Sequence, residues 1–94
     1  MKILWSVASV RHLQQVVEYI RDPLAVGAAT VRRRIFETVS RLGKMPYSGR
    51  EGRIPRTREA VVPGTAYIVV YRIEAETVEV LGIWHTARDG PASL

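Results

Sequence analysis

The stretch that decides the fold reads VVPGTAYIVVYRI from Val61 to Ile73 and TVEVLGIWH from Thr77 to His85. β-Branched and aromatic residues dominate both runs, which predicts strands over Ala66–Ile73 and Thr77–His85 with a tight turn at 74–76. Pro63 and Gly64 occupy the two central positions that a type II turn favours. That turn joins the first of these strands to an earlier strand over Thr57–Val62, so the C-terminal half is predicted to be a three-stranded β-meander.

Upstream of the meander, the pattern changes from strand to helix. Lys2–Trp5 is predicted to be a short strand, and Ser6 is a suitable N-cap for a following helix. Apolar residues then recur at the spacing of one helical face, at Val10, Leu13, Val16, Val17 and Ile20. Asp22-Pro23 is expected to end this helix.

A second amphipathic helix follows the proline. Its apolar stripe consists of Ala25, Ala28, Val31, Ile35, Val39 and Leu42, and Gly43 is the expected stop signal. The segment 44–56 contains two prolines and two glycines, so we expect an irregular loop there. The order β-α-α-β-β-β predicts an α+β fold in which a helical hairpin packs on one face of a mostly antiparallel, twisted sheet.

Length and composition limit the kinds of function that this chain can have. It has 94 residues, 47% of them hydrophobic, and no cysteine. We expect a single domain over residues 1–94, because two halves of this size could not each bury a core. Without cysteine and with two isolated histidines, we expect no disulfide, no metal and no cofactor. No signal peptide or membrane-spanning run is evident, so we expect a cytoplasmic protein without a membrane partner.

The positive charge is concentrated in one part of the chain. The nine basic residues from Arg32 to Arg58 accompany only two acidic residues in that interval, a local charge of +7, whereas the whole chain carries +5. We call this set the arginine belt, and it comprises Arg32, Arg33, Arg34, Arg41, Lys44, Arg50, Arg53, Arg56 and Arg58. Clustered cations favour a polyanion or an acidic protein partner. A solvated helix face followed by a polar loop would give the same pattern.

The strand predicted over Ala66–Ile73 is apolar on both faces. Tyr67, Val69, Tyr71 and Ile73 point one way, and Ile68, Val70 and Arg72 point the other. Two helices can cover only one face, so Ile68 and Val70 are expected on an exposed surface that a partner covers. The alternative is that this strand is simply central in the sheet and shielded by long neighbouring side chains.

Four segments of the chain resemble the RelE/ParE superfamily of bacterial type II toxins. These are Val61–Ile73, Val78–Arg88, the loop Pro46-Tyr47-Ser48-Gly49-Arg50, and Trp5-Ser6 leading into a helix with Leu13 and Tyr19-Ile20. The resemblance implies a toxin that a cognate antitoxin neutralises, with operator DNA contacted only through that antitoxin. ParE-like members of the superfamily act on DNA gyrase, whereas RelE-like members cut mRNA on the ribosome.

The residues favour a ParE-like toxin that acts by binding over a RelE-like ribonuclease. RelE-like toxins have an arginine directly after the tyrosine that opens the central strand, but here Tyr67 is followed by Ile68, which cannot stabilise a phosphorane. If the protein were nevertheless a ribonuclease, its catalytic groups would be His85 as the general acid with Arg58, Arg72 and Arg88. A third possibility is a degenerate, non-toxic member that serves as a co-repressor bound to its antitoxin.

The candidate partner-binding residues are drawn from the arginine belt and the second sheet face. They are Arg32, Arg33, Arg50, Arg53, Arg56, Arg58, Ile68 and Val70. Other polar and aromatic side chains that could take part in a site have structural alternatives. Arg72 is placed to pair with Glu59, Glu74 or Glu79, and His85 could be a hydrogen-bonded residue at a strand end. Tyr67 and Tyr71 are expected as core or interface rings, and His12 as a solvated residue.

Overall fold

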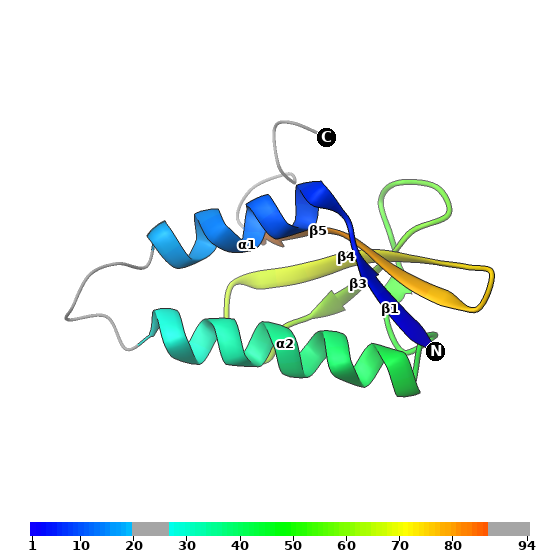
Figure 1. Ribbon diagram of the computed structural model, residues 1–94, viewed down its shortest axis with the longest axis horizontal. Helices are drawn as coiled ribbons and strands as arrows, with labels where there is room; N and C mark the ends of the chain where they lie inside the picture. The colour runs from blue at the N-terminus through cyan, green and yellow to red at the C-terminus, as the bar shows by residue number, and fades with distance from the viewer. Residues whose placement is uncertain (20–26, 87–94) are drawn as a thin grey trace.

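Two helices and five strands make up the part of the chain that the computed structural model describes, residues 1–19 and 27–86. The elements are β1 (Lys2–Trp5), α1 (Val7–Tyr19), α2 (Ala28–Lys44), β2 (Arg50–Glu51), β3 (Arg58–Val61), β4 (Tyr67–Glu74) and β5 (Thr77–His85). The sheet order is β1-β5-β4-β3-β2, with β1 parallel to β5 and the other pairs antiparallel. The two helices run antiparallel to one another (Figure 1). The predicted α+β fold is confirmed, and β2 is an addition within the predicted loop.

The sequence predicted the start of α1 correctly but not the end of α2. Ser6 caps α1 as expected, because its Oγ accepts a 3.0 Å hydrogen bond from the backbone N–H of Ser9. The prediction that Gly43 ends α2 is wrong, since the helix continues through Lys44. A β-carbon at Gly43 would lie 3.1 Å from Ile3 Cδ1 and 3.2 Å from the Met1 carbonyl oxygen, so this glycine allows β1 to approach the helix. Ile20, Asp22-Pro23 and Ala25 lie outside the described residues.

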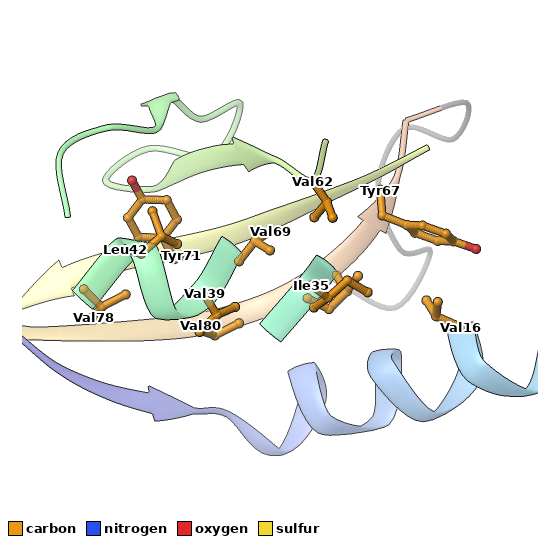
Figure 2. Packing of buried hydrophobic residues seen from close by; sticks show 11 residues of the cluster. Val16, Ile35, Val39, Leu42, Val62, Tyr67, Val69, Tyr71, Val78 and Val80 are labelled. Atoms are coloured by element: carbon orange, nitrogen blue, oxygen red, sulfur yellow. The ribbon is translucent and has the colours of Figure 1, made fainter. Parts of the chain in front are cut away.

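The main core lies between the helices and the sheet. Ile35, Val39 and Leu42 of α2 point at the strands, where Val69 and Tyr71 of β4 and Val78 and Val80 of β5 meet them (Figure 2). All seven side chains are buried. Val10 was expected on the core face of α1 but is exposed. It lies about 120° around the helix from the buried Val16, because successive residues are about 100° apart.

Two turns and one bulge set the faces of the meander. Gly64 has a φ of 71°, and the Thr65 N–H donates to the Val62 carbonyl at 3.2 Å, which agrees with the predicted type II turn. In β5, Val70 pairs with Gly82 and Tyr71 with Val80, so Leu81 between them is a bulge residue. The bulge turns the rest of β5 so that Ile83 joins the main core.

Candidate partner-binding surface

The sheet face away from the helices is closed, contrary to the expectation from the sequence. Ile68, Val70 and Trp84 form a second buried cluster there, with 0%, 1% and 4% of their surfaces exposed. The segment after β2 folds back over this face and places the guanidinium of Arg53 5.2 Å from the centre of the Trp84 ring. Ile68 and Val70 are therefore core residues in this conformation. A partner cannot reach them without displacing what covers them.

A buried carboxylate holds the returning segment in place. Glu59 is only 3% exposed, and it forms ion pairs with Arg50 at 3.1 Å and with Arg53 at 3.3 Å. The backbone N–H of Arg53 also donates to this carboxylate, at 3.0 Å. Burial by itself would raise the pKa of Glu59, but these hydrogen bonds outweigh it and hold the pKa below its ordinary value. Arg50 and Arg53 thus already have an acidic partner within the chain.

Other arginines also have partners within the chain. Arg33 forms a 3.6 Å ion pair with Glu37, one turn further along α2, and Arg32 stacks 5.0 Å from the centre of the Phe36 ring. Arg72, outside the belt, pairs with Glu79 at 2.9 Å and Glu74 at 3.4 Å, as the structural alternative predicted. The belt is therefore not a uniform array of free cations. Glu59, one residue beyond its end, neutralises part of its charge.

The loop between α2 and β2 is fixed by Tyr71 and Arg58. The Tyr71 hydroxyl donates to the Pro46 carbonyl oxygen at 2.7 Å and accepts from the Gly49 N–H at 3.0 Å. Burial raises the pKa of Tyr71 above its ordinary value, so the hydroxyl keeps its proton. Arg58 donates to the carbonyl oxygens of Tyr47 and Gly49 and stacks on the Tyr47 ring. The expectation that Tyr71 is a core ring is confirmed, but the sequence did not reveal that it anchors this loop.

A groove runs along the outer side of α2, between this helix and the edge of β3. Its larger part has a volume of about 440 Å³ and is lined by Thr38, Arg41, Leu42, Met45, Ser48, Gly49, Arg50, Glu59, Ala60 and Val61. An adjoining hollow of about 280 Å³ is lined by Arg34, Glu37, Thr38, Arg41, Pro63 and Gly64. Thr38 and Arg41 border both parts, so the two hollows adjoin one another, and arginines line each of them. Arg34 and Arg41 belong to the belt but were not among the predicted binding residues.

The residues proposed for RNA cleavage do not come together in the described part of the chain. His85 pairs with Tyr67 and Arg58 pairs with Tyr71, so four residues of β4, about 13 Å, separate them along the sheet. Arg58 lies on the helix side with Tyr71, whereas Arg72 is on the opposite face beside Glu79. Arg58 and Arg72, two of the candidate catalytic cations, therefore lie on opposite faces of the sheet. Arg88 lies outside the described residues.

His12 is a structural residue, which corrects the expectation that it is solvated. It is 7% exposed, and its Nδ1 accepts a 3.2 Å hydrogen bond from the backbone N–H of Ile83 in β5. Burial lowers the pKa of His12, which keeps the ring neutral and able to accept this bond. His85, at the end of β5, packs edge-on against Tyr67 with ring centres 5.2 Å apart.

Two further features are absent from residues 1–19 and 27–86. No cluster of three or more histidine or acidic side chains is placed to hold a metal ion. Neither α1 nor α2 has the length and apolar character that crossing a bilayer demands.

A protein from a solved toxin–antitoxin system shares the fold of this chain. A solved structure titled "Chromosomal ParDE TA system from P. aeruginosa" superposes with a TM-score of 0.80, covering 90% of this chain and 95% of the other at 17% sequence identity. Residues 3–90 match the family described as the ParE toxin of the type II toxin-antitoxin system, parDE. The chain is also 38% identical, over 99% of its length and 96% of the relative's, to "Putative toxin Y4kP" of Sinorhizobium fredii (strain NBRC 101917 / NGR234). The protein belongs to the ParE family of type II toxins.

Proposed function

We propose that this toxin inhibits growth in the cytoplasm by binding DNA gyrase and blocking replication, and that a cognate antitoxin neutralises it. The observation that carries the proposal is the dispersal of the three candidate catalytic groups in the described residues, His85, Arg58 and Arg72, over opposite faces and distant positions of the sheet. General acid–base cleavage of RNA needs an acid, a base and cations within a few ångströms of one phosphate. A toxin that acts by binding needs no such convergence.

The antitoxin part of the proposal is supported by family membership and by charge. The fold neighbour is titled as a ParDE toxin–antitoxin system, and ParE toxins belong to two-component modules. The present chain has a sequence pI of about 10.2. An acidic segment is the complement that such a surface attracts.

The test is to induce the toxin in growing cells and follow DNA, RNA and protein synthesis separately by isotope incorporation. Gyrase inhibition predicts early loss of DNA synthesis and filamentation, with translation continuing at first. The purified toxin is also expected to block supercoiling of relaxed plasmid by gyrase, and equimolar antitoxin to restore it. Co-expression of the antitoxin in the cells is the matched control.

Two other outcomes would overturn the gyrase proposal. Immediate arrest of translation with codon-phased cuts in mRNA, lost in His85→Ala, would identify a ribosome-dependent ribonuclease. Normal growth despite confirmed expression of the folded protein, together with operator binding by the toxin–antitoxin complex, would identify a non-toxic co-repressor.

A further inference from the structure

We propose that the tip of the β2–β3 hairpin, residues 52–57, is the surface through which the toxin binds DNA gyrase. In this contact Arg56 pairs with an acidic patch of the enzyme and Ile54 supplies an apolar contact. The inference rests on the proposed inhibition of gyrase and specifies which part of the toxin makes the contact. Three features of the tip carry it: a strained arginine, a fixed backbone and an exposed apolar side chain beside the cation.

Arg56 has a backbone conformation that arginine rarely adopts. The Thr57 N–H donates to the Ile54 carbonyl at 3.2 Å, so residues 54–57 form a β-turn with Pro55 and Arg56 at its centre. A type II turn favours proline at its second position and requires a positive φ at its third. Arg56 has a φ of 64°, a conformation that glycine adopts at the least cost.

The chain contains a second turn of the same pattern, and that turn uses glycine. Residues 62–65 have proline and threonine at the same positions as the tip, and Gly64, with a φ of 71°, corresponds to Arg56. In both turns the threonine hydroxyl donates to the carbonyl oxygen three residues earlier, at 2.9 Å from Thr65 and 2.6 Å from Thr57. The arginine therefore carries a conformational cost that glycine avoids in the equivalent turn.

The Arg56 side chain does not offset this cost by pairing within the described chain. It is exposed, and no ion pair joins it to any residue in 1–19 or 27–86. Ala75 and Glu76 also have positive φ, but they form the two-residue loop between β4 and β5, where hairpin geometry requires it. Strained residues cluster at binding sites, where the side chain serves recognition at the expense of stability.

The backbone of the tip is fixed on both sides of the turn. The Gly52 N–H donates to the Thr57 carbonyl at 2.8 Å, which closes the loop. The Arg53 N–H donates to the buried Glu59 carboxylate at 3.0 Å, and the Arg53 guanidinium lies over the Trp84 ring. A preformed loop loses little conformational entropy when a partner binds, so this tip is suited to recognition without rearrangement.

Trp84 supports the tip in a way that core packing alone does not require. Its indole N–H is buried and has no acceptor among the described residues, which is unfavourable and which a phenylalanine ring would avoid. Indole is, however, the aromatic group that attracts a guanidinium most strongly, and Arg53 lies over this ring. The contact with Arg53 accounts for an indole at this position.

The side chains that the tip presents indicate the chemistry of the partner. Arg56 is a cation without a carboxylate in the described chain, and the neighbouring Ile54 is 40% exposed. Arg53 keeps 46% of its side chain exposed although it pairs with Glu59. Carboxylates beside an apolar surface complement this set, and a protein surface offers both. Phosphates alone would leave Ile54 without a complement, so the tip fits an acidic protein surface better than it fits DNA.

The first experiment separates gyrase binding from folding. Arg56→Gly gives the turn its preferred residue and removes the cation, whereas Arg56→Lys keeps the charge. The half-inhibitory concentration of the purified toxin is measured in a gyrase supercoiling assay, and its thermal midpoint by circular dichroism. Arg56→Gly is expected to raise the half-inhibitory concentration about tenfold with a thermal midpoint no lower than that of the unaltered toxin, and Arg56→Lys to raise it less than about threefold.

Either of two results for Arg56→Gly would overturn the proposal. Unchanged inhibition would mean that the arginine does not contact gyrase. A clearly lower thermal midpoint would mean that the arginine serves folding and that the turn does not store strain for recognition.

The second experiment uses matched positions on α1. Arg11→Gln removes the same charge from an exposed site and is expected to change the half-inhibitory concentration less than about twofold. Ile54→Ser is expected to raise it about fivefold, and Val7→Ser, at a side chain that is 71% exposed, less than about twofold. Equal effects at Arg11 and Arg56 would mean that only net charge matters and would overturn the tip as the binding surface.

The same assays distinguish failure of this inference from failure of the proposed function. If the unaltered toxin does not inhibit gyrase, the proposed function is wrong. If it inhibits gyrase and the tip variants inhibit equally well, only the assignment to the tip is wrong. Binding of the toxin to plasmid without gyrase, measured by gel shift and lost in Arg56→Gly, would assign the tip to DNA and overturn the protein partner.

Discussion

Tyr71 reaches from the centre of the sheet to the loop after α2, where its hydroxyl donates a 2.7 Å hydrogen bond to the carbonyl oxygen of Pro46. The Tyr71 hydroxyl oxygen also accepts a 3.0 Å hydrogen bond from the Gly49 N–H, so one buried hydroxyl satisfies two backbone groups of the loop. This contact sets the distance between the end of α2 and the edge of the sheet. It therefore positions one wall of the groove that lies between them.

Removing that hydroxyl should destabilise the protein. Tyr71→Phe leaves the buried Gly49 N–H without its acceptor, and an unsatisfied buried group costs about 1–3 kcal/mol. The free energy of unfolding from urea titration is expected to fall by that amount. Tyr47→Phe, at an exposed ring in the same loop, is the control and should change it by less than about 0.5 kcal/mol. Equal stability of Tyr71→Phe and the unaltered protein would contradict the anchoring role.

Glu59 should make the free energy of unfolding depend on pH in the acidic range. Its lowered pKa means that the folded state favours the carboxylate, so its stabilisation is complete above about pH 5 and is lost as the pH falls through the lowered pKa. Glu59→Gln is expected to reduce the free energy of unfolding by about 1–3 kcal/mol at pH 7, and the difference from the unaltered protein should shrink towards pH 3. Glu51→Gln, at the exposed neighbouring position, should show no such difference. If the difference in the free energy of unfolding between the unaltered protein and Glu59→Gln did not change with pH, Glu59 would not be ionised in the folded state.

His12 should add a second pH dependence at higher pH. Because burial lowers its pKa in the folded state, the unfolded chain takes up the proton first, and the free energy of unfolding should fall as the pH drops below about 6.5. His12→Asn keeps an acceptor for the Ile83 N–H but does not titrate. This variant is expected to lose the decline between about pH 7.5 and 5.5. His85→Asn should retain the decline. If the decline disappeared in His85→Asn instead, His12 would not be the residue responsible for it.

Ile68 should behave as a core residue and not as a surface residue. Ile68→Ala removes three carbons from a fully buried position, which costs about 2–5 kcal/mol. The matched change Val61→Ala, at a side chain that is 54% exposed, should cost less than about 1 kcal/mol. Both values can be read from urea denaturation followed by circular dichroism. If Ile68→Ala lowered the free energy of unfolding by less than about 1 kcal/mol, Ile68 would be exposed in solution, as the sequence predicted.

The order of elements was determined by local sequence. β-Branched and aromatic runs, the Pro63-Gly64 turn and the cap at Ser6 each act within a few residues, so β1 and β5 were predicted with the bounds that the structure has. The two-residue strand β2 was not predicted, because its residues, Arg50 and Glu51, have no strand propensity of their own. Pairing with Arg58 and Glu59 makes it a strand.

What the sequence determined by itself is the α+β fold, the family resemblance and the presence of a concentrated positive charge. Only the tertiary structure decided which of those charges are free. The pairing of Arg50 and Arg53 with Glu59 closes one face over Ile68 and Val70, while Arg34 and Arg41 line a groove that no linear pattern marks. The physical reason is distance. Periodicity and turn chemistry act between near neighbours, whereas ion pairs, burial and grooves depend on segments that only folding brings together.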